Sequence, residues 1–189
     1  MIKIGILGDI GSGKSFVAKN FRYPVFNADK VVADLYKKDK KIFIRLKKKL
    51  PKYFYSFPID KKDVSNAILS SENNLRKIVK MVHAEVRKKM SLFIKNNKKK
   101  KIIILDIPLL LENKINKKKD ILIFVQSSRK EILKRLKKRN NFNKKIVNKF
   151  RNIQLPLDYK RNRSHFIIKN DFTEKKIKKI IKEILKKIL

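Results

Sequence analysis

The chain has 189 residues, of which 42% are hydrophobic, and it contains no cysteine. This length and composition support one globular domain with a hydrophobic core and exclude a disulfide framework. The longest apolar run, residues 102–111, is interrupted by Asp106 and Pro108 and is too short to span a bilayer. Because the first residues carry no secretory signal, we expect a cytoplasmic protein that does not enter a membrane.

The formal net charge of +37 at pH 7 is typical of proteins that bind nucleic acid. The lysines, however, are dispersed along nearly every expected helix and form no single basic stripe. We therefore favour a solvated surface over a dedicated nucleic-acid face, and we predict no specific nucleic-acid partner. The charge should still cause weak, salt-dependent adhesion to polyanions and help to attract anionic substrates.

A phosphate-binding loop is the clearest motif, because residues 8–15, GDIGSGKS, match G-x-x-x-x-G-K-[ST]. Residues 2–7 predict a buried strand before the loop, and residues 16–21 predict the start of a helix after it. Lys14 is expected to reach the β- and γ-phosphates of ATP, and the Ser15 hydroxyl to complete a Mg²⁺ shell. The predicted ATP-binding residues of this segment are Gly8, Asp9, Ile10, Gly11, Ser12, Gly13, Lys14, Ser15 and Phe16.

The middle of the chain alternates between strand and helix patterns. Residues 24–26 predict a second strand that ends at Asn27-Ala28-Asp29, and residues 30–50 are largely helical. Residues 60–97 are helical again, with Ser71 as an N-cap and apolar residues at helical spacing. This last stretch is our candidate for a helical insertion that binds the substrate.

The second half begins with apolar runs at 102–106 and 121–125, which predict strands of a parallel sheet covered on both faces. Ser128 and Glu131 form a capping box that opens a helix expected to reach Arg139. The remaining expected features are a break at 140–143, a strand at 166–168 and an amphipathic helix at 177–188.

This order of elements predicts an α/β fold in which helices flank a parallel sheet of the P-loop NTPase type. We expect residues 1–58 and 98–189 to form the nucleotide-binding core, with a lid at about 139–151. Residues 59–97 would form the helical substrate-binding insertion. The composition does not indicate an oligomeric state.

The phosphate loop alone does not separate a kinase from a GTPase or an ATPase. The chain is small, lacks the Asn/Thr-Lys-x-Asp guanine signature and has Arg135 and Arg139 four residues apart, which favours a small-molecule kinase. These two arginines could face a transferring phosphate from one side of a helix. The alternative, two solvated arginines, is about equally supported by the spacing.

From Ile4 to about Asn170 the chain resembles the dephospho-CoA kinase family. The segments that carry the resemblance are the phosphate loop, Asn27-Ala28-Asp29, His83-Ala84, residues 106–112 (DIPLLLE), Arg135 through Arg139, and Arg151-Asn152-Ile153-Gln154. They correspond in order to the family's phosphate loop, Asp-Ala-Asp, His-Pro, Pro-Leu-Leu-aromatic-Glu, Arg-x-x-x-Arg and Arg-x-x-Gln. The chain departs from the family pattern at Phe16, Asn27, Ala84 and Ser164-His165.

The resemblance implies transfer of the ATP γ-phosphoryl group to the ribose 3′-hydroxyl of dephospho-CoA, the final step of CoA biosynthesis, with Mg²⁺ accompanying ATP. Asp29, at a predicted strand end, would accept or orient the hydroxyl proton, although it could instead cap the helix from Lys30. Lys14 and Arg139 would stabilise the transferring group with support from Arg135, beneath a closing lid. The implied substrate-binding residues are Asp29, His83, Pro108, Leu109 and Arg151.

Two alternatives remain at this stage. Another small P-loop kinase, acting on a nucleoside or nucleotide, would share the fold and the loop and differ in the helical insertion. A nucleic-acid-binding ATPase would use the basic surface instead. A zinc site is not expected, because the two histidines are far apart in the sequence and cysteine is absent.

Overall fold

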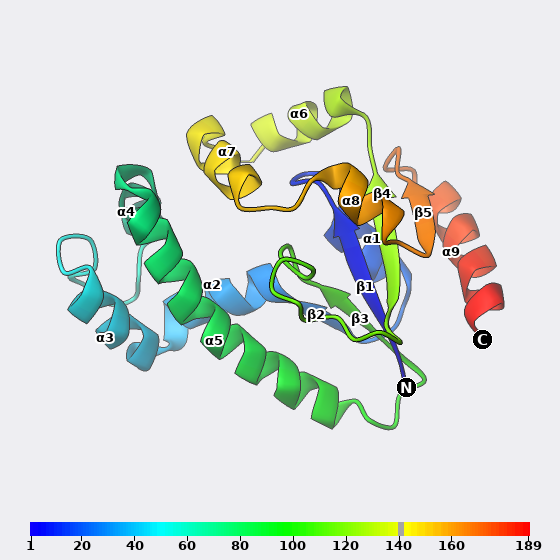
Figure 1. Cartoon of the computed structure of the whole chain (residues 1–189), viewed down its shortest axis with the longest axis horizontal. Helices are drawn as coiled ribbons and strands as arrows, with labels where there is room; N and C mark the ends of the chain where they lie inside the picture. The colour runs from blue at the N-terminus through cyan, green and yellow to red at the C-terminus, as the bar shows by residue number, and fades with distance from the viewer. Residues whose placement is uncertain (140–141) are drawn as a thin grey trace. The chain divides into compact units, whose positions relative to one another are not determined.

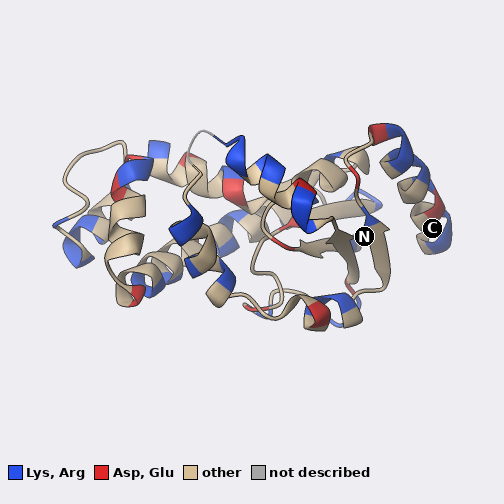
Figure 2. Cartoon of the chain, turned by 90° about the horizontal axis from the view of Figure 1, so that it is seen from above, with Lys and Arg blue, Asp and Glu red and all other residues tan. Residues whose placement is uncertain are grey.

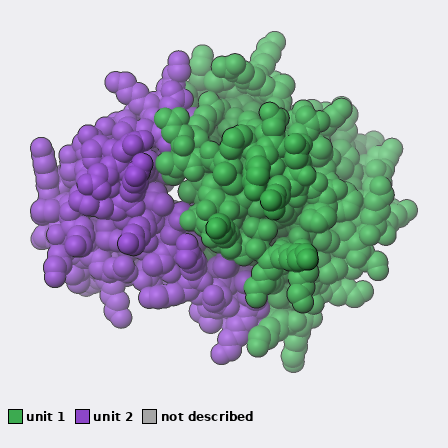
Figure 3. Space-filling model, viewed as in Figure 1, with its two compact units in different colours: residues 1–27, 97–142, 151–189 green, residues 28–96, 143–150 purple. Residues whose placement is uncertain are grey.

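The computed structural model describes residues 1–139 and 142–189. It divides into two compact units, which Figure 3 colours separately. The first unit comprises Met1–Asn27, Asn97–Phe142 and Arg151–Leu189, and the second comprises Ala28–Asn96 and Asn143–Phe150. Within the described residues, no helix combines the length and the hydropathy needed to cross a membrane.

A parallel sheet forms the centre of the first unit (Figure 1), and its strands within the described residues lie in the order β2-β3-β1-β4-β5. The strands are β1 (Ile2–Gly8), β2 (Val25–Asn27), β3 (Ile102–Asp106), β4 (Ile121–Gln126) and β5 (Phe166–Lys169). All neighbouring strands are parallel, and Asn27 at the end of β2 pairs with Asp106 at the end of β3. The predicted sheet is confirmed, and the carboxyl ends of its strands meet at one edge, where such sheets bind ligands.

Helices flank this sheet, as expected. Those of the first unit are α1 (Lys14–Asn20), α6 (Arg129–Lys137), α8 (Leu157–Asn162) and α9 (Glu174–Ile188). In Figure 1, α8 crosses in front of the sheet and α1 lies behind it. The core contains fully buried aliphatic side chains from strands and helices, among them Ile4, Ile104, Val17 and Ile177. Each such side chain stabilises the fold by roughly 1.5–3 kcal/mol relative to an exposed position.

The second unit is helical and contains α2 (Ala28–Lys38), α3 (Lys40–Lys49), α4 (Lys61–Ser70), α5 (Glu72–Asn96) and most of α7 (Lys144–Asn152). Helices α2, α3 and α4 all contact α5. The face of α5 that is buried carries Leu75, Ile78, Val82 and Val86. Because α2 and α3 pack on α5, the compact unit begins at Ala28, earlier than the insertion expected at 59–97.

Several helix boundaries differ from the expected ones. Residues 30–50 form two helices, because the Asp39 carboxylate accepts hydrogen bonds from the N–H groups of Lys41 and Ile42 and caps α3. Helix α6 ends at Lys137, so Arg139 lies beyond it. Helices α7 and α8 were not expected. The expected N-cap at Ser71 is confirmed by its hydrogen bond from Asn74 N, 3.1 Å long. Residues 140–141 of the expected break lie outside the described residues.

Candidate phosphate-binding site

The loop between β1 and α1 has the backbone that a phosphate-binding loop requires. Gly11 and Gly13 have φ angles of 87° and 88°, which side-chain-bearing residues rarely adopt. A Cβ atom at Gly13 would also lie 2.5 Å from the Phe172 ring and closer still to the Asn170 side chain. Position 13 therefore accepts only glycine, both for its backbone angle and for the space around it.

Side chains that follow β4 and β5 hold the loop in place by hydrogen bonds. The Ser12 carbonyl accepts hydrogen bonds from Asn170 Nδ2 and Ser127 Oγ, each 2.8 Å long. In a planar trans peptide the next N–H points opposite to that carbonyl, so the Gly13 N–H faces away from Ser127 and Asn170. Fixing the Ser12 carbonyl thus orients an N–H group of the loop for an anion.

Lys14, the first residue of α1, folds back across the loop. Its Nζ donates to Asp9 O at 2.8 Å and to Gly8 O at 3.1 Å. The ammonium group therefore lies above the backbone that would surround a phosphate, adding to the partial positive charge at the N-terminus of α1. The contact of Lys14 with the β- and γ-phosphates stays a prediction from the sequence.

Ser15 belongs to a polar cluster at the carboxyl edge of the sheet. Its Oγ donates a 2.5 Å hydrogen bond to Asp106 Oδ2, and Asn27 Nδ2 donates to the same oxygen at 2.6 Å. Asn27 Nδ2 also lies 3.3 Å from Ser15 Oγ. Asp106 is only 3% exposed, so this carboxylate is held in a fixed position by neighbours from β2 and α1.

The chemistry of this cluster fits a magnesium ion. Mg²⁺ prefers oxygen ligands and is usually bound through one or two protein groups together with substrate phosphates and water. The Ser15 hydroxyl and the Asp106 carboxylate offer such oxygens beside the loop. Within residues 1–139 and 142–189, no group of three or more His, Cys, Asp or Glu side chains is placed to hold a metal ion.

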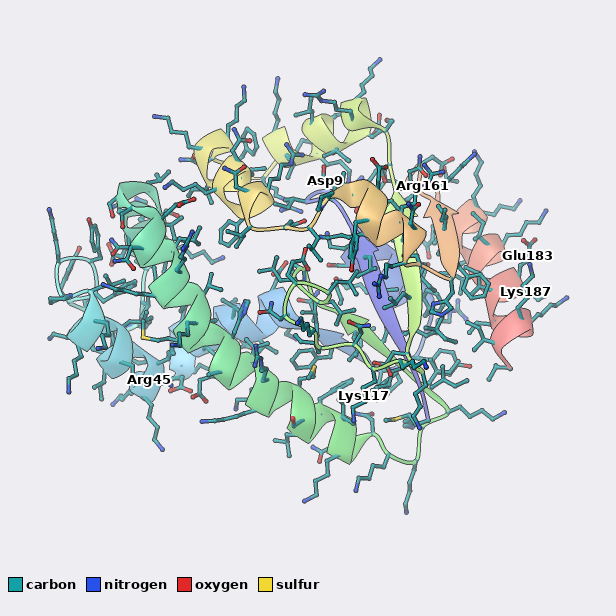
Figure 4. All side chains as sticks on the ribbon, in the orientation of Figure 1. Asp9, Arg45, Lys117, Arg161, Glu183 and Lys187 are labelled. Carbon is teal, nitrogen blue, oxygen red and sulfur yellow. The ribbon has the colours of Figure 1, made fainter. Side chains whose placement is uncertain are left out.

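Arg151, at the end of α7, contacts the phosphate loop through Asp9. Its Nη2 and Nε donate to the two carboxylate oxygens of Asp9 at 2.9 and 3.3 Å. A cavity of about 730 Å³ lies beside this pair. Figure 4 labels Asp9 at the end of β1 and Arg161 on α8, and the cavity lining includes both. Arg129 and Arg151 line the same cavity, so its three arginines outnumber its two aspartates, Asp9 and Asp158, and the space favours anions.

Arg135 stacks on an aromatic ring at the other side of the loop. Its guanidinium carbon lies 3.8 Å from the centre of the Phe172 ring. The Phe172 ring is also 6.2 Å from the ring of Phe16, the third residue of α1. A planar cation and two aromatic rings therefore stand together next to Gly13, an arrangement that suits a flat aromatic base.

The other predicted site residues lie in several places. Leu109 is buried in the turn after β3 and Pro108 beside it is half-buried, so Leu109 offers little side-chain surface to a substrate. Arg139 is exposed just past α6. Asp29 and His83 belong to the second unit: Asp29 is exposed in the first turn of α2, and His83 is half-buried on α5. Since α2 begins at Ala28, Asp29 is not the residue that caps it.

Sequence reasoning missed the residues that complete the loop's surroundings. Asp106 had a usable signal, because it ends an apolar strand and a carboxylate there is a common metal partner of a phosphate loop. Asn170, Ser127 and Phe172 had none, since only the fold brings them to the loop. His165 has a structural contact: its Nδ1 accepts a 3.0 Å hydrogen bond from Leu122 N and extends the pairing of β4 with β5.

The phosphate loop on a parallel sheet, with a carboxylate at the end of the adjacent strand, defines a P-loop nucleotide-binding protein. A sequence model described as dephospho-CoA kinase matches residues 2–176. The dephospho-CoA kinase of Wolbachia pipientis wMel is 35% identical over 187 residues, covering 96% of this chain and 95% of that protein. The chain belongs to the dephospho-CoA kinase family.

Solved structures share this fold. The crystal structure of TT1252 from Thermus thermophilus has a TM-score of 0.76 and 26% identity, with 100% of this chain and 98% of that chain covered. Dephospho-CoA kinase from Campylobacter jejuni has a TM-score of 0.64 at 17% identity, covering 98% and 96%, and at this identity it supports the fold alone.

Proposed function

We propose that this protein transfers the γ-phosphoryl group of ATP to the ribose 3′-hydroxyl of dephospho-CoA, giving CoA and ADP. Family membership supports the reaction, and the observation that carries it is the Ser15–Asp106 contact beside Lys14 and the glycine loop. These groups can neutralise the charge of a triphosphate and of its metal. We also propose a cytoplasmic location, because the chain contains no cysteine that could form a disulfide.

ATP would bind with its phosphates in the loop and its base beside Arg135 and Phe172. Lys14 would leave the carbonyls of Gly8 and Asp9 for the β- and γ-phosphates. The stacked guanidinium and ring of Arg135 and Phe172 offer two flat surfaces to adenine. Arg139, exposed at the start of the expected lid, would approach the γ-phosphate when the lid closes.

The Ser15 hydroxyl and the Asp106 carboxylate would hold Mg²⁺ together with the phosphates of ATP. When bound, the metal supplies charge neutralisation to the transferring group. Asn27 donates to Asp106 and so fixes the carboxylate that faces Ser15. Its amide replaces the first carboxylate of the family's Asp-Ala-Asp motif and adds no negative charge beside Asp106.

The acceptor end of the reaction is assigned to the residues that the family resemblance implies. We propose that Asp29 orients the 3′-hydroxyl and takes its proton while the hydroxyl oxygen bonds to the γ-phosphorus and the bond to ADP breaks. His83 on α5, Pro108 after β3 and Arg151 would bind the acceptor, and the buried Leu109 would support the turn that carries Pro108. Arg151 already binds the carboxylate of Asp9, and a guanidinium group binds phosphate in the same geometry. Arg151 would therefore contact a phosphate group of the acceptor.

The test is ADP release from ATP and Mg²⁺ with a panel of acceptors: dephospho-CoA, adenosine, AMP and other nucleotides, with Lys14→Ala as the inactive control. We expect a strong preference for dephospho-CoA. Preference for a mononucleotide would indicate another small P-loop kinase.

A parallel assay with DNA or RNA and no acceptor tests the nucleic-acid alternative. Each described helix carries Lys or Arg (Figure 2), so sequence-blind adhesion that is lost at moderate salt is expected. ATP turnover stimulated by nucleic acid at physiological salt would contradict the kinase proposal.

A further inference from the structure

Lys160 is a buried lysine in a protein whose other lysines are mostly exposed. It lies on α8 with a side chain only 1% exposed. Its Nζ is 2.6 Å from Glu112 Oε1 and donates to Gln154 Oε1 at 3.0 Å. Burying an ammonium group costs free energy unless it is paired, so these two contacts offset the cost of burying the Lys160 side chain.

Lys160, Glu112 and Gln154 form a polar cluster that links the turn after β3 to residues 154–160. Glu112 belongs to the turn after β3, and its Oε1 also accepts a 3.0 Å hydrogen bond from Leu155 N. One carboxylate oxygen thus contacts both the side chain of Lys160 and the backbone that follows Gln154. The turn after β3, the residues 154–155 and helix α8 are therefore tied together at a single buried point.

Gln154 of this cluster lies three residues after Arg151 in the chain. Gln154 N donates to Arg151 O at 3.0 Å, so the backbone between the two residues turns tightly. Residues 151, 152 and 154–158 also line the cavity beside the phosphate loop, together with Asp9 and Ser12. Fixing Gln154 and Leu155 consequently limits where the Arg151 guanidinium can reach.

We propose that Lys160 is a positioning residue for the phosphoryl transfer: its contacts with Glu112 and Gln154 hold Arg151 beside the phosphate loop. Arg151 then meets Asp9 in the structure and lies ready for the anionic groups of the substrates. A displacement of about 1 Å at such a group lowers rates up to about a hundredfold. The inference rests on the proposed function for its kinetic readout only.

The first test is a mutant cycle between positions 160 and 151, measured as kcat and KM for phosphorylation of dephospho-CoA. We expect Lys160→Met to lower kcat roughly tenfold to a hundredfold with a small change in the KM for ATP. In an Arg151→Ala background the same change should lower kcat less than about twofold, because coupled residues are not additive. An equal loss in both backgrounds would overturn the proposal.

A second variant separates positioning from stability, because Lys160→Met leaves the Glu112 carboxylate buried and unpaired. Lys160→Met combined with Glu112→Gln should recover the unfolding midpoint but keep the low kcat, since the tie to Gln154 is still missing. Recovery of both the unfolding midpoint and kcat would mean that the pair of Lys160 and Glu112 is purely structural, and it would contradict the inference. Lys3→Met, which breaks the partly buried pair of Lys3 with Asp120, is the matched control and should leave kcat near wild type.

A third measurement does not depend on catalysis. The Arg151 Nε–H donates to Asp9, and its ¹H–¹⁵N signal can be identified by its loss in Arg151→Lys. We expect this signal to shift or broaden in Lys160→Met and to stay in place in Lys3→Met. An unchanged signal in Lys160→Met would refute the positioning role. Failure of the wild type to phosphorylate dephospho-CoA would instead refute the proposed function and leave this readout valid.

Discussion

Ser15 Oγ and Asp106 Oδ2 are 2.5 Å apart, which joins the start of α1 to the last residue of β3. The contact depends on the parallel sheet, because β1 leads directly into the loop and β3 is its neighbour. A hydroxyl and a buried carboxylate are thereby placed where the metal of a bound nucleotide is expected.

Asp106→Asn should lower kcat roughly a hundredfold or more and raise the Mg²⁺ concentration needed for half-maximal activity, because the amide lacks the negative charge. The measurement is turnover across a Mg²⁺ titration, with the unfolding midpoint as a check of the fold. Asp120→Asn is the control, since Asp120 is another buried aspartate and its partner is Lys3. Normal activity and Mg²⁺ dependence in Asp106→Asn would contradict the assigned metal site.

The sheet could be predicted because its strands carry an unusually clear signal. Ile102 to Leu105 and Ile121 to Val125 are continuous apolar runs, as expected for strands covered on both faces. The local helix signals at Ser71 and Ser128 also hold, since the side chain of each caps the helix that follows it. Patterns that act within a few residues were thus sufficient for most elements.

The parts that could not be predicted depend on distant contacts. Nothing in the sequence distinguishes Lys160 from the many exposed lysines, because its burial follows from the turn that carries Glu112. Phe172 follows β5 and lies beside Arg135 because the fold brings these distant segments together. Helix α8 is short and begins after Pro156, and its local pattern is too brief to indicate a helix.

Phe172→Ala should raise the KM for ATP by about three- to tenfold and leave kcat nearly unchanged, because a cation–aromatic stack contributes about 0.5–1 kcal/mol or more to a bound base. The measurement is initial rate against ATP concentration at saturating acceptor. Phe43→Ala is the control for removing a ring that faces a cation, here Lys47 at 5.9 Å. An unchanged KM for ATP in Phe172→Ala would show that adenine does not stack beside Phe172.

Asp171 next to this ring should titrate unusually low. Hydrogen bonds from Lys176 and from the Thr173 N–H lower the pKa of its carboxyl from 3.8 to about 2. Its folded pKa is the lower one, so its stabilising contribution is present above about pH 4 and is lost as pH falls toward 2. A ¹³C titration of the carboxyl measures this, and Lys176→Met should return the midpoint toward 3.8. A wild-type midpoint near 3.8 would disprove the contact in solution.

Asp29→Asn should lower kcat by about 10²–10⁴-fold and leave the affinity for ATP nearly unchanged, because a general base acts on the acceptor and not on the nucleotide. Asp29 is exposed in the first turn of α2, directly after β2. Since its motif begins with Asn27, no neighbouring carboxylate within the motif can substitute for it. The measurements are single-turnover rates with dephospho-CoA and equilibrium binding of ATP.

Asp34→Asn, at another exposed aspartate of α2, is the matched control for Asp29→Asn and should remain active. If Asp29→Asn turns over at the wild-type rate, Asp29 is not the base, although the preference for dephospho-CoA could still hold. If it instead loses ATP affinity together with kcat, its carboxylate acts on the bound nucleotide or its metal. A selective loss of kcat with unchanged binding is the result that assigns the proton of the 3′-hydroxyl to Asp29.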